Sequence, residues 1–329
     1  MSTPRTVLPD ARVLPRFAGV STFCRVPLIE AVPAAGQPVD WALYGVPFDG
    51  GVTYRPGARF GPRAIRDASQ YMRPVHLEHR INIFDALSIA DAGDAPVKPY
   101  SCRETFDAAR EFAAVIGDPG HTRLLAVGGD HSIALANIAA TWQRRGRPPG
   151  GLAVLHFDAH LDTLDEVWGE KWGHASPFLR AAEQKFIDPA RMLSIGIRGP
   201  GNDLADFDTA RKLGIEVVSF EQWRSGEAEA RLDSFRQRFG DDEVYLSFDI
   251  DCVDPAFAPG TGTPVCGGFT SADVFGLLRR FVGINLVGAD VVEVLPDADP
   301  AGVTSLLAGH IIVEILALAA VRASTDAGS

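Results

Sequence analysis

The sequence predicts a single α/β domain of three layers, in which helices cover both faces of a mostly parallel, doubly wound sheet. Short apolar runs alternate with longer segments of helical periodicity from Trp41 onward, which is typical of repeated βαβ units. The runs are apolar without strict alternation, as expected of parallel strands buried on both faces. No linker, repeat or low-complexity tract interrupts the rest of the 329-residue chain, so we expect residues 41–329 to form one domain.

The elements are expected in a regular order along the chain. Strands are predicted where the apolar runs are short, at residues 41–46, 124–129, 151–157, 190–197, 215–220, 243–248 and 285–294. Helices are predicted where the apolar positions follow a longer period, at residues 62–68, 102–116, 132–144, 177–183 and 305–321. The last of these, SLLAGHIIVEILALAAV, is apolar on nearly all sides and should be largely buried.

Residues 1–40 are expected to form an extended N-terminal arm rather than a packed element. Prolines recur there among few periodic apolar positions, at Pro4, Pro9, Pro15, Pro27, Pro33 and Pro38. Arms of this kind commonly lie across a neighbouring subunit.

Charge and cysteine content exclude several classes of partner. With 31 basic and 42 acidic residues the formal charge is −11, which disfavours nucleic acid and anionic membrane surfaces and favours a small cation, although solubility alone explains such a charge. The four cysteines form no CxxC pair, which argues against a disulfide framework and a thiolate zinc site. The chain shows no signal-peptide core and no uncharged apolar stretch of 18 residues, so a cytoplasmic protein outside the membrane is expected.

Three polar clusters follow predicted strands, at the edge where parallel sheets bind their ligands. They are GGDHS at 128–132, DAHLD at 158–162 and DID at 249–251. Side chains alternate along an extended segment, so the ligand-type residues of each cluster should share a side. Solvated turns or helix caps are the alternative interpretation, but Phe157, Phe248 and Ile250 place these acids beside buried backbone. Clustered carboxylates without a cation would repel one another and have raised pKa values.

The donor set indicates a pair of divalent ions. Oxygen and nitrogen ligands without thiolate suit Mn²⁺, and the imidazoles widen the choice to Ni²⁺, Co²⁺ or Zn²⁺. Six ligands are more than a single catalytic ion can bind if it is to keep one position open for water or substrate. Two ions bridged by carboxylates therefore fit better. Such a centre lowers the pKa of bound water and holds a nucleophile at neutral pH. The six expected ligands are His131, Asp158, His160, Asp162, Asp249 and Asp251.

Several stretches together make the sequence resemble the ureohydrolase (arginase/agmatinase) family, most closely its agmatinase branch. They are GVPFDGGVTYRPGARFGPRAIR at 45–66, GGDHS at 128–132, FDAHLDT at 157–163, SFDIDCVDPAFAPGTGTP at 247–264 and DVVEVLP at 290–296. The resemblance implies an arginase-like fold for residues 41–329 as the catalytic domain, assembled as homo-trimers or homo-hexamers. A hetero-oligomer with a paralogous subunit is a further expectation.

The resemblance also implies an activity and the roles of residues. The enzyme would hydrolyse a small cationic guanidino substrate to urea and an amine, with a metal-bridging hydroxide as the nucleophile. Agmatine-like compounds, guanidino acids, guanidine and substituted guanidines or biguanides remain open. One metal, manganese in most relatives and nickel in some, would bind His131, Asp158, Asp162 and Asp249, and the other Asp158, His160, Asp249 and Asp251. Glu293 would grip the guanidinium and His174 would carry a proton, so that His174, Glu293 and Asp162 are the expected catalytic residues.

Two alternatives stay open, and the substrate is the least determined feature. The chain could be a non-catalytic supporting subunit, or a single-metal deacetylase-like amidohydrolase. Leu161, Ala175, Ser176, Leu295 and Ala298 depart from the family pattern beside the expected site. No Asn and Ser pair follows DAHLDT with arginase spacing, so L-arginine should be a poor substrate. Cys252 is expected to be buried without binding metal, and His156 to hydrogen-bond near a ligand.

Overall fold

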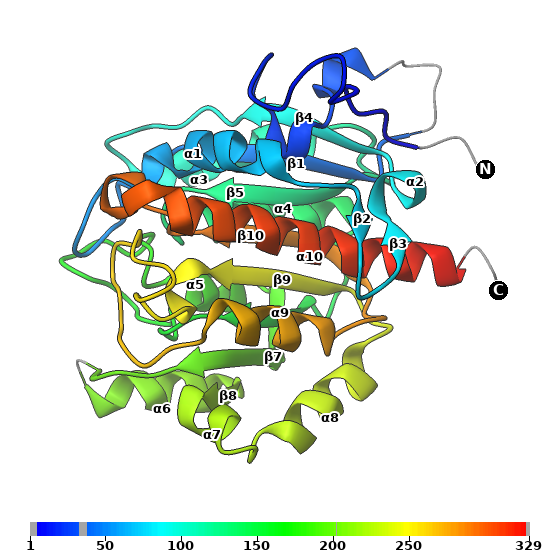
Figure 1. The fold of residues 1–329 in the computed structure, drawn as a ribbon. Helices are drawn as coiled ribbons and strands as arrows, with labels where there is room; N and C mark the ends of the chain where they lie inside the picture. The colour runs from blue at the N-terminus through cyan, green and yellow to red at the C-terminus, as the bar shows by residue number, and fades with distance from the viewer. Residues whose placement is uncertain (1–4, 33–37, 202, 327–329) are drawn as a thin grey trace.

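A central sheet of eight strands, all parallel, organises the protein in the computed structural model, which describes residues 5–32, 38–201 and 203–326 (Figure 1). Each neighbouring pair of strands runs in parallel register. From edge to edge the strands are β4 (Ile89–Asp94), β1 (Trp41–Val46), β5 (Arg123–Gly128), β10 (Leu286–Val292), β9 (Val244–Asp249), β6 (Leu152–Phe157), β7 (Ile187–Ile197) and β8 (Glu216–Ser219).

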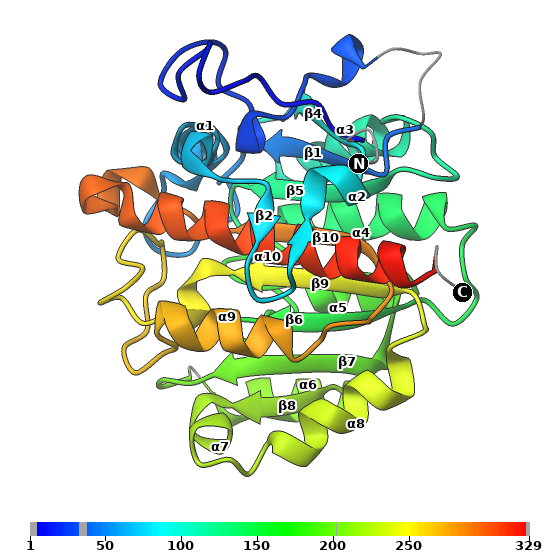
Figure 2. The ribbon, with the colours of Figure 1, turned by 45° about the vertical axis from the view of Figure 1, so that its right-hand side comes forward.

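Helices cover both faces of the sheet, as Figures 1 and 2 show. One face carries α1 (Gly61–Ala68), α9 (Ser271–Arg279) and α10 (Val303–Asp326), and the other carries α3 (Cys102–Ala114), α4 (Ile133–Arg144) and α5 (Pro177–Glu183). Near the β8 edge lie α6 (Leu204–Leu213), α7 (Phe220–Arg224) and α8 (Glu229–Phe239). The expected three-layer, doubly wound α/β fold is therefore confirmed.

The central strands have the burial that the apolar runs predict. Every residue of β1, β6, β9 and β10 is buried, because helices cover both faces. The sequence analysis missed the edge strand β4, whose sequence IADAGD contains two aspartates. Arg66 on α1 forms ion pairs with both Asp91 and Asp94, which allows the fully buried Asp91 to lie inside a strand. A short antiparallel hairpin, β2 (Val75–His76) and β3 (Ile81–Asn82), and the helix α2 (Ile83–Ala86) were also missed.

Helix α10 packs as a core helix. By length and composition the segment Pro300–Asp326 is the one stretch of the described residues that could cross a membrane, but 78% of its apolar window is buried within the protein. It lies along the sheet between α1 and α9 (Figure 2). The burial expected for the terminal helix is observed.

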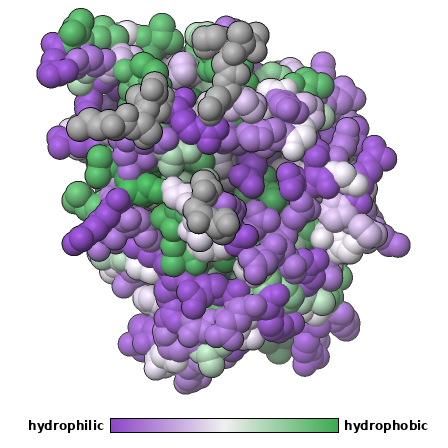
Figure 3. All heavy atoms as spheres, turned by 90° about the vertical axis from the view of Figure 1, so that its right-hand side faces the viewer, coloured by the Kyte–Doolittle hydropathy of each residue, from purple (hydrophilic) through white to green (hydrophobic). Residues whose placement is uncertain are grey.

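The N-terminal segment differs from the expected arm, since part of it is packed. Residues 1–4 and 33–37, with Pro4 and Pro33, lie outside the described residues. Phe23, Cys24 and Val26 are fully buried, and the Phe23 N–H donates to the Asp91 carboxylate at 3.0 Å. By contrast, Phe17 is 92% exposed, and three other apolar side chains of the segment, Val7, Val13 and Val20, are also largely exposed. Figure 3 shows a largely hydrophilic face on which apolar side chains gather near the top, where this segment lies.

Strand order brings the polar clusters together. The carboxyl ends of the strands point to the left in Figure 1. The four strands β5, β10, β9 and β6 are neighbours at the centre of the sheet. The segments that follow these strands begin with Gly129, Glu293, Ile250 and Asp158, so distant parts of the chain meet at one edge.

Candidate active site

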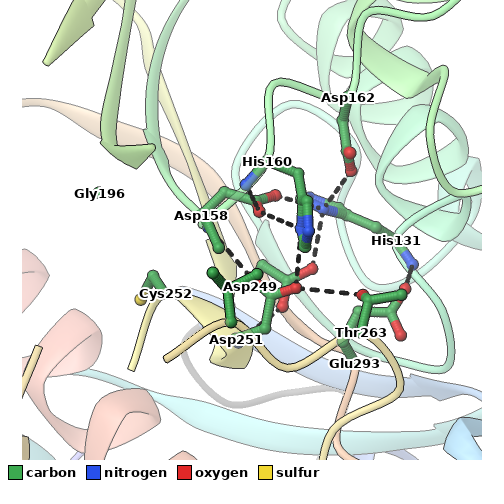
Figure 4. Close-up of polar contacts among 12 residues, drawn as sticks. His131, Asp158, His160, Asp162, Gly196, Asp249, Asp251, Cys252, Thr263 and Glu293 are labelled. Carbon is green, nitrogen blue, oxygen red and sulfur yellow. Dashed lines mark hydrogen bonds and ion pairs between the residues drawn. The ribbon is translucent and has the colours of Figure 1, made fainter. Parts of the chain in front are cut away.

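His131 lies at the centre of the first group of carboxylates. Its Nδ1 atom is 3.1 Å from Asp158 Oδ2, 2.9 Å from Asp162 Oδ2 and 3.2 Å from Asp249 Oδ2 (Figure 4). This nitrogen is buried, yet no carboxylate oxygen meets the geometry of a hydrogen bond with it. One nitrogen and three carboxylate oxygens facing a common point are a donor set for a divalent ion.

His160 forms a second group beside the first. Its Nδ1 atom lies 3.0 Å from Asp251 Oδ2 and 3.4 Å from Asp158 Oδ1. Asp158 therefore presents one oxygen to each histidine, which is the position of a bridging ligand. Asp249 contacts His131, and its Oδ1 accepts a hydrogen bond from the Asp251 N–H at 2.8 Å. Its expected place in the second group stays a prediction.

The two groups require positive charge. Burial and the carboxylates of Asp251 and Asp158 raise the pKa of Asp249 well above its ordinary value. Burial alone would lower the pKa of His131 and of His160, but the surrounding carboxylates raise both values well above normal. Protonated histidines thus provide the charge that divalent ions would provide at the same oxygens, so these residues fit a metal pair.

The local backbone is not the extended chain that the sequence analysis assumed. Strand β6 ends at Phe157, and Asp162 has a positive φ of 53°. After Asp249 the chain forms a 3-10 turn, Ile250–Cys252. The expectation that the side chains of the DAHLD and DID clusters alternate along an extended backbone is therefore wrong. The side chains converge because backbone N–H groups hold the carboxylates, such as the Ala159 N–H on Asp251 Oδ1 at 3.0 Å.

A buried chain of hydrogen bonds orients His131. Its Nε2 atom lies 2.8 Å from Ser247 Oγ, and the Ser247 hydroxyl donates to Asp290 Oδ1 at 2.7 Å. Since this hydroxyl donates to Asp290, it accepts the Nε2–H of His131, so Nδ1 is the nitrogen that faces the carboxylates and would bind a metal ion once its own proton has left. Tyr245 donates to the other oxygen of Asp290 at 2.6 Å.

The sequence analysis missed Ser247 and Asp290. A signal was present, because Ser247 lies two residues before Asp249 on β9, and Asp290 interrupts an apolar strand. The expected hydrogen bond of His156 is observed, with its Nε2 2.9 Å from Asp158 Oδ2 and its Nδ1 3.1 Å from Ser194 Oγ. Cys252 is buried and free, and burial raises the pKa of its thiol well above the ordinary value. The other cysteines are also free.

Glu293 follows β10 and is buried with a positive φ of 66°. Strained backbone of this kind often marks a functional position. Its Oε1 accepts hydrogen bonds from the His131 N–H and from His174 Nδ1, each at 2.8 Å. Its Oε2 is buried and accepts no hydrogen bond from the described residues. The expected two-oxygen grip on a guanidinium is therefore only half available while His174 holds Oε1.

His174 lies between Glu293 and Thr53. The Thr53 N–H donates to its Nε2 at 3.0 Å, and Thr53 Oγ1 lies 2.8 Å from the same nitrogen. Burial lowers the pKa of His174 and the Thr53 N–H opposes protonation, but the Glu293 carboxylate outweighs both and raises the pKa to about 9. When protonated, the ring can donate from Nδ1 to Glu293 and from Nε2 to Thr53 Oγ1.

The two groups open into a cavity of about 600 Å³. Thr53, His160, Asp162, His174, Asp249, Asp251 and Thr263 line its inner part. The structure thus brings all six expected ligands together, with His174 beside them and Glu293 behind His131 and His174.

A third group of potential ligands, His76, His79 and Glu314, lies outside this cavity. The sequence analysis assigned no ligand role to these histidines. The His79 N–H donates to His76 Nδ1 at 3.2 Å, so His76 Nε2 carries the proton that points to Glu314 at 3.1 Å. Arg279 also pairs with Glu314, at 3.1 Å from its Nε. These contacts describe a structural ion-pair group.

A parallel α/β sheet with a buried carboxylate–histidine centre at the carboxyl ends of its strands defines a hydrolytic enzyme of the arginase type. A family model described as the Arginase family matches residues 39–318. This chain therefore belongs to the arginase family, and it is a hydrolase.

Individual relatives cover nearly the whole chain. A guanidinopropionase of Pseudomonas aeruginosa is 44% identical over 97% of this chain and 97% of the relative. A mitochondrial agmatinase of Gallus gallus is 38% identical over 94% of this chain and 88% of the relative. The solved proclavaminate amidino hydrolase from Streptomyces clavuligerus has a TM-score of 0.84 at 40% identity, covering 94% of this chain and 99% of that one. The resemblance to the ureohydrolases is thereby confirmed.

The contact between Ser247 and His131 leads to a prediction about metal affinity. Ser247→Ala should weaken divalent-ion binding on the order of 10-fold or more, because it removes the hydrogen-bond partner of His131 Nε2 and of Asp290 Oδ1. Calorimetric titration of the metal-free protein measures this. Thr141→Val is the control, since the Thr141 hydroxyl is buried without a hydrogen bond. Equal affinities in the two variants would contradict the assigned role of Ser247.

Proposed function

We propose that this protein hydrolyses a small cationic guanidino compound to urea and an amine at a centre of two divalent ions, manganese or, alternatively, nickel. The observation that carries the proposal is the buried, unpartnered Oε2 of Glu293 beside the two carboxylate–histidine groups. A carboxylate oxygen without a donor in a buried position is costly unless a ligand supplies the donor. A guanidinium supplies such N–H donors and a positive charge.

The family relationship supports the same class of substrate. The relatives are named guanidinopropionase, agmatinase and proclavaminate amidino hydrolase. Two divalent ions held by His131, Asp158, Asp162, Asp249, His160 and Asp251 would supply Lewis-acid chemistry that makes water nucleophilic at neutral pH. The chain's own residues bind the guanidinium, orient it and move the proton.

Glu293 orients the substrate. One guanidinium N–H donates to Oε2, which is free, and a second can reach Oε1 only when His174 leaves that oxygen. Binding of the guanidinium and the His174–Glu293 contact therefore compete. The residual negative charge of four carboxylates with two divalent ions and a hydroxide favours a cationic head group over a neutral amide or urea.

His174 is the proposed proton donor for the leaving amine. It is protonated below about pH 9 and lines the cavity. The Thr53 N–H donates to its Nε2 and holds the imidazole in the cavity, which the ligand Asp162 also lines.

We further propose a cytoplasmic homo-oligomer, a trimer or hexamer. Free cysteines suit a reducing compartment, and Cys24, Cys102 and Cys252 are buried as thiols. The exposed apolar residues Val13 and Phe17 of the N-terminal segment are suited to an interface with another subunit. Light scattering after size-exclusion chromatography measures the number of subunits, and a paralogous subunit remains the alternative for a chain that is inactive alone.

Urea release is the direct test of the proposed function. The metal-loaded enzyme should release urea from at least one of agmatine, 4-guanidinobutanoate, guanidine and an N,N-dimethylated biguanide, and L-arginine should be poor. Glu293→Gln should lower kcat/KM on the order of 10²-fold or more, since it removes the charged partner of the guanidinium. Glu229→Gln, an exposed position on α8, is the matched control. No urea from any compound would favour the supporting-subunit alternative.

The metal content per chain distinguishes a centre of two ions from a site with a single ion. Elemental analysis should find close to two divalent ions per chain, and Asp251→Asn should lose one of them, because the Asp251 carboxylate lies 3.0 Å from Nδ1 of His160 in the second group. Circular dichroism should remain native, since the buried strands carry the fold. Asp241→Asn, at an exposed ion pair, should keep both ions. A single ion in the fully active enzyme would point to the deacetylase-like alternative.

The pH profile tests His174. Its raised pKa of about 9 means that the proton donor is present below this pH and is lost as the pH rises through it. The kcat/KM of the wild type, which reports the substrate-free enzyme, should therefore fall above about pH 9. His174→Ala should retain both ions, lose on the order of 10²-fold in kcat and lose this alkaline fall. His310→Ala, on α10, is the control; an unchanged rate in His174→Ala would remove His174 from the reaction.

A further inference from the structure

The outer part of the cavity has a composition of its own. Beyond the reacting groups its walls come from the segment between β6 and α5 and from the segment between β7 and α6. The side chains there are largely apolar: Leu164, Val167, Trp168, Ile197, Pro200 and Phe207. Whatever substituent the guanidino group carries must lie against these walls.

Arg198 is the only lysine or arginine among the described residues that line the cavity. A guanidinium has five N–H donors. In Arg198, Nε donates to Val265 O at 3.2 Å, and Nη1 donates to Gly196 O at 3.3 Å and Cys252 O at 2.9 Å. Nη2 donates to Asp251 O at 2.8 Å and Val265 O at 2.6 Å, with Val253 O at 3.4 Å.

All five donors of Arg198 are thus directed at backbone carbonyls. Three of these carbonyls belong to Asp251, Cys252 and Val253, the turn that positions the metal ligand Asp251. Turning the guanidinium toward a substrate would leave these carbonyls without their donors and release the turn. Arg198 therefore holds this backbone turn in place and has no N–H group left to donate to a substrate carboxylate.

The other charged group on the outer wall is acidic. Asp206, in the first turn of α6, lines the cavity. It accepts a long hydrogen bond of 3.4 Å from the Asp203 N–H, and no lysine or arginine among the described residues forms an ion pair with it. A carboxylate tail would meet this charge in a partly apolar space, whereas an ammonium would be attracted by it and by the faces of Trp168 and Phe207.

We propose that the outer cavity selects guanidino substrates with an uncharged or cationic tail and rejects those with a carboxylate tail. The inference rests on the proposed function and narrows its substrate class. It separates this chain from a relative that is 44% identical and is named for guanidinopropionate, a carboxylate. Sequence identity to that relative therefore does not carry its substrate over.

Substrates of matched length test the selection. The metal-loaded enzyme is assayed for urea release with agmatine, butylguanidine and 4-guanidinobutanoate, which differ mainly at the end of the tail. Agmatine and butylguanidine should each exceed 4-guanidinobutanoate in kcat/KM by at least about tenfold, from one unfavourable charge contact. A preference for 4-guanidinobutanoate would overturn the inference and leave the proposed function standing. If none of these three compounds releases urea, and guanidine and the biguanide also release none, both the inference and the proposed function are contradicted.

A variant isolates the acidic wall. Asp206→Asn keeps a side-chain oxygen for the Asp203 N–H and removes the charge. It should raise kcat/KM for 4-guanidinobutanoate and lower it for agmatine, each by about threefold or more, while butylguanidine stays unchanged and so reports intact folding. Asp208→Asn, which pairs with Arg211 on the same helix and does not line the cavity, should change none of the three. Parallel changes for all three substrates in Asp206→Asn would contradict a charge effect on the tail.

Discussion

The crowding of carboxylates at one edge of the sheet is the constraint on which the rest of the site depends. Asp158, Asp249 and Asp251 are almost completely buried, and Asp162 lies next to them. Like charges at such distances are unfavourable in a medium of low dielectric unless cations lie between them. Histidine rings and backbone N–H groups surround these acids on the protein side. The open side faces the cavity, where metal ions and a cationic substrate would complete the balance.

This constraint extends into the core. From His131 the hydrogen bonds run through Ser247 to Asp290, and Tyr245 links that carboxylate to Asn137, whose side chain also binds Tyr44. The residues from Ser247 to Tyr44 belong to β9, β10, α4 and β1. The series of hydrogen bonds that sets the tautomer of His131 therefore also links central elements of the fold. A buried polar network of this type is stable only when each member has a partner. The site and the core therefore cannot be altered independently here.

Sequence patterns predicted the central strands and the converging clusters, because an apolar run that ends in acids and histidines has few alternatives in a parallel sheet. They failed where the decisive partner is distant in sequence. Strand β4 is stabilised by the ion pair of its Asp91 with Arg66, and Arg198 donates to the carbonyls of Cys252 and Val265. No local sequence pattern predicts either contact. The extended geometry assumed for DAHLD failed for a different reason. Hydrogen bonds between backbone and carboxylates, together with the left-handed residue Asp162, override the alternation of a strand.

The site separates two tasks between two kinds of structure. The groups that would act on the guanidinium follow buried central strands or contact each other in the interior, as Glu293 and His131 do. The groups that would meet the tail lie in the segment after β6 and from the end of β7 into α6, where Trp168 is largely exposed and Asp206 lies in the first turn of a surface helix. Trp168 and Asp206 are not among the residues that form the carboxylate–histidine centre, so either can change without removing a ligand or a hydrogen bond of that centre. The relatives carry the names of different guanidino substrates, and Arg198, the one lysine or arginine among the described residues of the cavity wall, donates its N–H groups to backbone carbonyls.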